Sequence, residues 1–297
     1  MLVSHKLPLY YIFRKIRYEL LFTFIISISV YYITHIYKDI LPVMPLTLSA
    51  FVGTAISILL SFKLNQSYDR WWEARKVWGE IVNDSRTFVI QLQTLQENVN
   101  VEMIRKMALR QIAWCYCLGQ SLRGLNPLEN IDNLISAEEI SEIKKNNNKP
   151  LKFLQLHAKD LAKLKQSGHL ELFSQIQLNN TIVRFTDAMG KAERIKNTVF
   201  PITYRYILHM IIYLFLIILS MSLTNTSIYF ELAFLLSIGT VFFLLDKTAL
   251  HLQDPFSNRP TDVSVTAIAR TIDINLRQLI NEPVVPDPLM PNRFYLM

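Results

Sequence analysis

The chain has 297 residues, of which 51% are hydrophobic, and its mean hydropathy is positive at +0.22. This balance excludes an ordinary soluble domain and indicates a protein that is partly in a membrane and partly in water. The formal net charge of +7 does not require a nucleic-acid partner, because membrane proteins retain lysine and arginine on their cytoplasmic side. Cys115 and Cys117 are too closely spaced for a structural zinc site, and they predict buried thiols without a disulfide framework.

The first 62 residues predict a surface segment followed by two membrane spans. Residues 1–19 mix basic side chains with aliphatic and aromatic ones, which is typical of an amphipathic segment at a membrane surface, although a simple basic flank is the alternative. Residues 20–37 are mostly apolar, and residues 41–62 carry no charge. At about 1.5 Å per residue such stretches cross a hydrocarbon core of about 30 Å, so residues 20–62 predict transmembrane helices 1 and 2. No small-residue cleavage site follows the first apolar run, so we expect no signal-peptide removal.

Two neighbouring stripes with a four-residue repeat run along the second span. The stripe of small residues consists of Ser49, Gly53, Ser57 and Ser61. The stripe beside it consists of Ala50, Thr54, Ile58 and Phe62. Small residues let helix backbones approach closely, so helix packing is the simplest interpretation of the first stripe. The alternative is a pore formed by several copies, in which Thr54, Ile58 and Phe62 would make stacked inward rings that gate by dewetting.

Residues 63–199 have a soluble composition and predict a cytoplasmic helical domain. Its first helix continues from the second span without a break, so we expect one helix to leave the membrane and extend into water. Residues 126–150 contain the runs NPLEN and KKNNNKP, which predict turns and an exposed loop. The helices expected in this domain cover residues 66–97, 100–122, 151–166 and 169–198.

Residues 200–246 predict transmembrane helices 3 and 4. Residues 201–223 and 230–245 are long and apolar, and a short uncharged turn joins them. Arg205 and His209 lie at the beginning of the third span, where such side chains usually extend toward the lipid headgroups. A role for either residue in ion conduction is the alternative.

Residues 247–297 predict a cytoplasmic C-terminal helix and an extended tail. Helical periodicity covers residues 263–280, with Asp262 or Ser264 as the N-cap. Residues 283–297 are rich in proline and lack periodicity, which predicts an extended tail that either wraps a partner subunit or is disordered.

The distribution of basic residues predicts the orientation in the membrane. The two connections between paired spans, at 38–42 and 224–229, contain a single basic residue, Lys38. The N-terminal segment, the 63–199 region and the C-terminal part are rich in lysine and arginine, so we expect all three in the cytoplasm. The sequence has no phosphate-binding loop, nucleophile elbow or zinc-protease motif, and its histidines lack metal-binding spacing. We therefore expect no enzyme, no cofactor and no metal site. The aromatic and basic residues at 68–78 are expected as membrane-interface anchors, with no nucleic acid as partner.

Three stretches resemble the bacterial bestrophin homologues, a family of ion channels. They are YDRWWEARKVWGEIVNDSR at 68–86, GKAERIKNTVFPITYRYILH at 190–209, and LDKTALHLQDPFSNRPTDVSVTAIARTIDINL at 245–276. The resemblance therefore covers essentially the whole chain. It implies an all-α integral membrane protein, with four transmembrane helices per protomer continuous with a cytoplasmic helical domain. It further implies a homopentamer around a central pore, in the bacterial inner membrane with both termini cytoplasmic.

The resemblance also implies where the pore is narrow. In the family, three rings on the second span form a hydrophobic neck, and counting from the Arg-Trp-Trp at 70–72 places these rings at Thr54, Ile58 and Phe62. Thr54 departs from the family, because this ring is usually a larger apolar residue. A second, cytoplasmic restriction precedes the third span. Counting back from the third span places this restriction at Phe173, with Leu172 and Ile176 as alternatives.

The expected function is the passage of monovalent ions. Bacterial relatives imply cations such as sodium, and an anion (chloride) channel of the same fold is the alternative. A non-conducting membrane protein with a binding or regulatory role is a further alternative, because a hydrophobic neck resembles a packed bundle core. Animal members bind calcium through an acidic run, but here DPFSNRPTD holds only Asp254 and Asp262, so we expect no calcium activation. The expected partners are the chain itself, membrane lipid and the permeating ions.

Overall fold

The structure is a computed structural model that describes residues 9–37, 39–42, 44–96, 100–198, 201–223, 226–291 and 295–296. Within these ranges all named elements are α-helices, and an isolated antiparallel bridge joins Gln96 to Leu170. The expected all-α fold class is confirmed. The helices are α1 (Leu9–Ile36), α2 (Leu46–Thr94), α3 (Val101–Leu122), α4 (Ala137–Lys144), α5 (Lys149–Gln166), α6 (Leu172–Asn197), α7 (Ile202–Ser222), α8 (Ile228–Gln253) and α9 (Val265–Leu279).

Four of these helices are long and apolar enough to cross a membrane, as expected. The candidate spans are Phe13–Ile36, Leu46–Thr94, Ile202–Ser222 and Ile228–Gln253. The second span is part of the unbroken 49-residue helix α2, which confirms the predicted continuous helix. Residues 9–19 belong to the same helix as the first span, whereas residues 1–8 of the expected surface segment lie outside the described residues.

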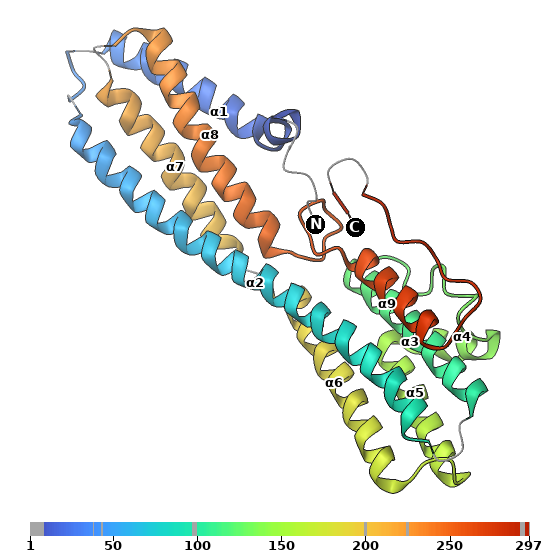
Figure 1. The fold of residues 1–297 in the computed structure, drawn as a ribbon. Coiled ribbons are helices and arrows are strands. Elements are labelled where there is room, and N and C mark those ends of the chain that lie inside the picture. Colours follow the sequence, from blue (N-terminus) through green and yellow to red (C-terminus); the bar gives the residue numbers. More distant parts are fainter. Residues whose placement is uncertain are drawn as a thin grey trace. The chain divides into compact units, whose positions relative to one another are not determined.

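The chain forms two compact units, and α2 contributes to both. One unit contains residues 4–70 and 199–254, that is, α1, α7, α8 and the first half of α2. In it α1, α7 and α8 pack against one another (Figure 1). Its core is apolar and joins all four helices through side chains such as Ile16, Ile56, Ile212, Leu235 and Phe243. Since these residues lie on one side of each helix, the remaining apolar sides are exposed in the protomer.

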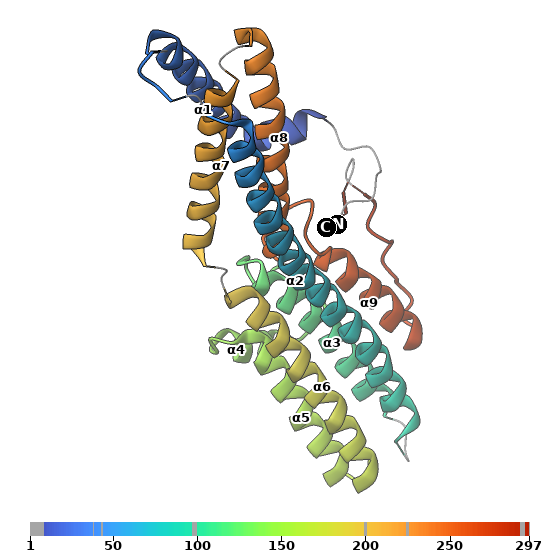
Figure 2. The same ribbon diagram turned by 90° about the vertical axis from the view of Figure 1, so that its left-hand side faces the viewer.

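The other unit is a bundle built from α3, α4, α5, α6, α9 and the second half of α2. Helix α3 packs against α5, α6 and α9, and α5 packs against α6, as Figure 2 shows. Large aromatic side chains fill the core, among them Trp78, Phe88, Trp114 and Phe185. The Phe88 and Phe185 rings meet edge to face at 5.8 Å.

Helix α4 corrects the expectation of a continuous loop at 126–150. Its N-cap is Ser136, whose hydroxyl accepts the Glu139 N–H at 3.3 Å. Ser followed three residues later by Glu is the capping pattern that begins many helices. The α9 N-cap is Ser264, one of the two residues expected there, although its side chain makes no capping bond. Asp262 instead accepts the backbone N–H groups of Ser257 and Arg259 at 2.7 and 3.0 Å.

A buried polar cluster lies inside the second bundle. The Arg110 guanidinium donates to Glu139 Oε1 at 2.5 Å and to Asp160 Oδ2 at 2.7 Å. Burial alone would raise the pKa of the Glu139 carboxyl, but the hydrogen bonds and charge of Arg110 hold it below its usual value. His157 is fully buried nearby, and neither ring nitrogen has a hydrogen-bond partner among the described residues. Burial and the Arg110 charge lower the pKa of His157 well below its usual value, which keeps the imidazole neutral.

Candidate functional site

Helix α2 has a buried side and an outward side within the four-helix unit. Ile56, Leu60 and Lys63 are buried against the other helices. Ile58 and Phe62 lie on the opposite side and are 52% and 62% exposed, and Thr54 is exposed on the same side. The stripe that the sequence analysis assigned to a pore neck therefore faces away from the protomer's core. Its role in a pore stays a prediction.

The stripe of small residues is divided between two environments. Ser49 is buried, and its hydroxyl is hydrogen-bonded to that of Ser222 on α7 at 3.0 Å. Gly53 lies so close to α7 that a Cβ atom there would be 3.1 Å from the Phe215 ring. Ser57 and Ser61 are exposed. Close helix packing inside the protomer thus accounts for the first half of the stripe and leaves the second half on the surface.

A cluster of three ionisable side chains connects α2, α7 and α8. Lys63 Nζ is 2.5 Å from Asp246 Oδ1, and both side chains are 1% exposed. His209 Nε2 is 2.9 Å from Asp246 Oδ2. The expectation that His209 extends toward the lipid headgroups is wrong, because its ring faces Asp246 and meets the Phe243 ring edge to face at 5.7 Å. Arg205, in contrast, is exposed, and its extension toward the lipid headgroups stays a prediction.

Sequence reasoning missed this cluster, although one signal was present. Lys63 directly follows the second span, and Asp246 ends the fourth, so each was interpreted as the boundary of a span. The structure continues both helices past these residues, which places the two charges inside the packed helices. Ionisable groups in such positions are costly unless they are paired, and their presence marks a candidate functional site.

A second set of polar contacts joins α1 to the end of α8. Lys247 Nζ is 2.6 Å from Glu19 Oε1, and Lys15 Nζ is 3.5 Å from His251 Nε2. Arg70 on α2 donates from Nε to the Gln253 carbonyl at 3.0 Å. These charged side chains therefore have partners within the protomer.

The three residues expected at the cytoplasmic restriction lie in the first turns of α6. Leu172, Phe173 and Ile176 are all exposed, and Phe173 is the most exposed of them at 80%. Glu171 is the N-cap and makes no side-chain capping bond. Exposure in one protomer fits all three residues, so it does not select the residue that would form the restriction.

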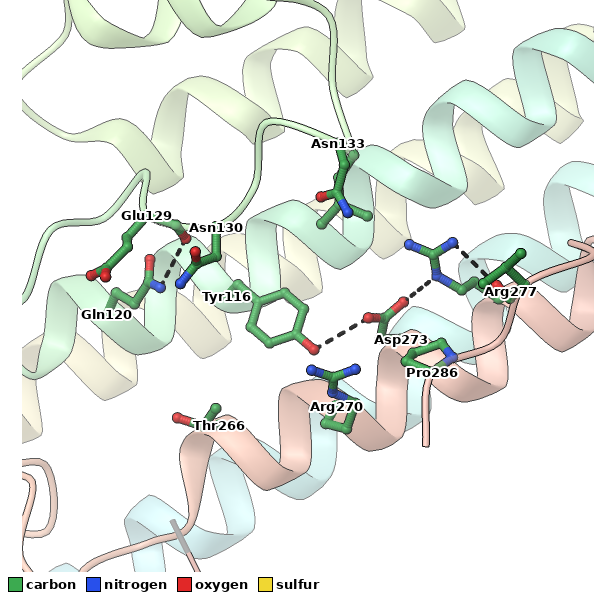
Figure 3. Close-up of a pocket in the computed structure, with 12 residues that line it drawn as sticks. Tyr116, Gln120, Glu129, Asn130, Asn133, Thr266, Arg270, Asp273, Arg277 and Pro286 are labelled. Atoms are coloured by element: carbon green, nitrogen blue, oxygen red, sulfur yellow. Dashed lines mark hydrogen bonds and ion pairs between the residues drawn. The ribbon is translucent and has the colours of Figure 1, made fainter. Parts of the chain in front are cut away.

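A cavity of about 340 Å³ opens in the bundle unit between α3, α9 and the loop at 126–134 (Figure 3). Across it, the Tyr116 hydroxyl donates to Asp273 Oδ2 at 3.2 Å, and Arg277 donates to Asp273 Oδ1 at 2.6 Å. Val284 and Pro286 of the C-terminal tail line the same cavity.

The C-terminal tail forms no helix or strand over 283–291, and part of it lies against its own protomer. Glu282 forms an ion pair with Arg105, and Arg277 Nη1 donates to the Val284 carbonyl at 3.4 Å. The expected wrapping of a partner subunit stays a prediction.

The comparisons with known proteins agree with the fold. Over residues 10–278 the chain matches the family described as "Bacterial/Fungal Bestrophin protein". The "Voltage-dependent anion channel-forming protein YneE" of Escherichia coli (strain K12) is 30% identical over 285 residues, which cover 96% of this chain and 93% of the relative. The similarly named RSc3414 of Ralstonia nicotianae is 25% identical over 246 residues, covering 82% and 80%.

A solved structure gives the same assignment. The crystal structure of a bacterial bestrophin homologue from Klebsiella pneumoniae matches with a TM-score of 0.84 at 26% sequence identity, covering 91% of this chain and 100% of that chain. The likeness extends over both the membrane-spanning helices and the helical bundle, as the resemblance of the three sequence stretches implied. This chain belongs to the bacterial and fungal bestrophin family.

Proposed function

We propose that the chain forms a homopentameric ion channel of the bacterial inner membrane, with one central pore for monovalent ions. The observation that carries this proposal is the similarity to YneE, a relative named as channel-forming, across 96% of the chain. Four candidate spans are consistent with a multi-pass membrane protein. The distribution of lysine and arginine supports cytoplasmic positions for both termini and for the regions 63–199 and 247–297.

The pore is proposed to favour anions. The expected preference for cations such as sodium finds no support in the relatives, whose names state anion-channel formation. Physical chemistry permits this choice, because the edge of a phenylalanine ring carries partial positive charge and Phe62 is the largest side chain of the proposed neck. A net charge of +7 per chain also favours the accumulation of anions near the protein.

The narrow part of the pore is proposed to be the neck of Thr54, Ile58 and Phe62. The outward position of these side chains supports it, since a face without a partner in the protomer is available to line an axis between copies. The first turns of α6 are proposed to form the cytoplasmic restriction, with Phe173 as the first choice and Leu172 and Ile176 as alternatives. Opening is proposed to be independent of micromolar calcium.

The first experiment measures the reversal potential of purified protein in a planar bilayer under a sodium chloride gradient. A value near the chloride equilibrium potential supports the proposal. A value near the sodium equilibrium potential would keep the channel and overturn its anion preference. Absence of current from protein that is pentameric by light scattering would support a non-conducting membrane protein instead.

A further inference from the structure

The cavity in the bundle unit is large enough for a small metabolite. Its volume is about 340 Å³, and ligand pockets in proteins begin at about 300 Å³. Helices α3 and α9, the loop at 126–134 and the C-terminal tail all contribute to its lining, so it lies within one compact unit of the chain. The described lining includes none of the residues proposed for the neck or for the cytoplasmic restriction.

Arg270 on α9 supplies a positive charge to this cavity. Within the described residues its guanidinium makes no hydrogen bond or ion pair, and its Nε atom is buried without a partner. Figure 3 shows the guanidinium beside the Tyr116 hydroxyl. The Asp273 carboxylate is engaged with other donors, since it accepts from Tyr116 at 3.2 Å and from Arg277 at 2.6 Å. A guanidinium that is partly buried and lacks a partner is stabilised by an anion, which supplies charge-assisted hydrogen bonds.

The charges nearby leave that of Arg270 largely uncompensated. Glu129 is exposed to solvent, and Figure 3 shows its carboxylate directed away from Arg270. Arg123 adds a further positive charge behind the cavity wall. Its Nη1 donates to Thr266 Oγ1 at 2.5 Å, and its Nη2 is buried with no partner in the described part of the chain. The field inside the cavity therefore favours a negatively charged group.

Gln120 on α3 supplies a hydrogen-bond acceptor. Its Nε2 donates to the Glu129 carbonyl at 3.1 Å, whereas its Oε1 is buried and accepts from no group of the described residues. A buried acceptor in this position is stabilised by a donor that a ligand brings. The Tyr116 ring lies between Gln120 and Arg270 in Figure 3, so a molecule that contacts both residues lies along this ring.

We propose that the cavity binds a small organic anion that carries one carboxylate and at least one hydroxyl group. The carboxylate pairs with the Arg270 guanidinium, whose planar shape matches it, and a hydroxyl donates to Gln120 Oε1. A hydroxyl suits this acceptor better than an ammonium, because Arg270 repels a second positive charge in the same cavity. The amides of Asn130 and Asn133 also line the cavity and offer hydrogen bonds to further hydroxyl groups.

Apolar side chains complete the lining and match the carbon chain of such a ligand. Leu134 comes from the loop, and Val284 and Pro286 come from the tail. The contact of Arg277 Nη1 with the Val284 carbonyl at 3.4 Å holds this part of the tail beside α9. Ligand pockets commonly combine apolar walls with a few polar groups that fix the orientation of the ligand.

The test measures binding to the purified full-length protein in detergent by isothermal titration calorimetry. The probes are lactate and gluconate, a short and a long hydroxycarboxylate. Acetate lacks the hydroxyl, glycerol lacks the carboxylate, and inorganic phosphate is an anion of different shape. We expect at least one of the two hydroxycarboxylates to bind with a Kd at least about tenfold lower than those of the three controls, because only it contacts both Arg270 and Gln120.

Three arginine variants locate the binding. Arg270→Met removes the charge and should weaken hydroxycarboxylate binding about 10-fold to 100-fold. Arg270→Lys keeps the charge without the planar fork and should weaken it less. Arg194→Met, at an exposed position of α6 outside the cavity, should bind as the wild type does. An anion bound elsewhere in the protein, for example in a pore, would be insensitive to Arg270→Met.

Thermal unfolding without ligand separates binding from a structural role. Because the Arg270 guanidinium makes no contact that stabilises the protomer, Arg270→Met should leave the thermal midpoint unchanged or raise it. Gln120→Leu loses the hydrogen bond to the Glu129 carbonyl, so it should lower the midpoint slightly as well as weaken binding.

Four outcomes would overturn the proposal. They are the failure of both hydroxycarboxylates to bind, equal binding of acetate or phosphate, binding that Arg270→Met retains, and loss of the pentamer or of thermal stability in Arg270→Met. The last outcome, checked by light scattering, would assign Arg270 to a contact within or between subunits. Binding is measured without ion flux, so a protein that conducts no ions would refute the proposed function and leave this result unaffected.

Discussion

Replacing Ile58 by alanine is expected to raise the single-channel conductance. The change removes three carbons from a side chain that is 52% exposed on the outward side of α2. Each apolar carbon in contact with water costs about 0.8 kcal/mol. About half of the side chain faces outward, so removing three carbons lowers the energetic barrier to a hydrated ion at the ring of Ile58 residues by about 1 kcal/mol per subunit. One subunit's share alone corresponds to about a fivefold rise in current.

The assay is single-channel recording in a planar bilayer, with thermal unfolding of the detergent-solubilised protein in parallel. Ile58→Ala should leave the thermal midpoint nearly unchanged, because exposed substitutions change stability little. Val241→Ala, at an exposed position of α8, should change neither quantity, and Ile56→Ala, at a fully buried position, should destabilise the fold by about 2–5 kcal/mol. An unchanged conductance in a folded, pentameric Ile58→Ala protein would remove this residue from the gate.

Two further predictions concern the bundle unit. Gly119→Ala places a Cβ atom 2.5 Å from Val265 Cγ1 and should lower the free energy of unfolding by about 1–3 kcal/mol. In the control Gly190→Ala, the new Cβ atom has no neighbour within 4 Å, and the free energy of unfolding should rise by about 1 kcal/mol. Equal thermal midpoints for the two variants would contradict the close approach of α3 and α9. The pKa of His157 in the folded protein lies below its unfolded value of about 6.5. The protein therefore keeps its full stability above about pH 6.5, and below that pH the free energy of unfolding falls by up to about 1.4 kcal/mol per pH unit. His157→Phe should flatten this dependence in thermal scans across pH, and an unchanged slope would assign the acid sensitivity to other groups.

The helices could be predicted from the sequence where the signal is local. The third span was expected at 201–223, and the helix is observed at Ile202–Ser222. A long, uninterrupted apolar run is a strong local signal for a membrane-spanning helix. The outward position of Ile58 and Phe62 likewise follows from the four-residue repeat, which places them on one side of α2. Helix α4 was missed although Ser136 and Glu139 carry a local signal, because the polar runs around it were given more weight.

The pairing of distant charges could not be predicted in this way. Lys63 and Asp246 are 183 residues apart, and each lies beside an apolar run where a charge ordinarily marks the end of a span. Only the folded structure reveals that both side chains are buried and that they form an ion pair with each other. The register of the proposed cytoplasmic restriction is undecided for a similar reason, since Leu172, Phe173 and Ile176 are all exposed in the protomer and only contacts between copies would distinguish them.

The burial of both native thiols gives the protein an unreactive background for site-directed labelling. Cys115 and Cys117 are fully buried in α3, and burial raises the pKa of each to about 12, so neither forms the thiolate that alkylating reagents attack. A single cysteine introduced on the outward side of α2 would therefore be the one thiol that reacts in the folded protein. Its rate of modification, recorded as a progressive block of the current, would report whether water reaches that turn in the closed and open states, without prior removal of the native cysteines.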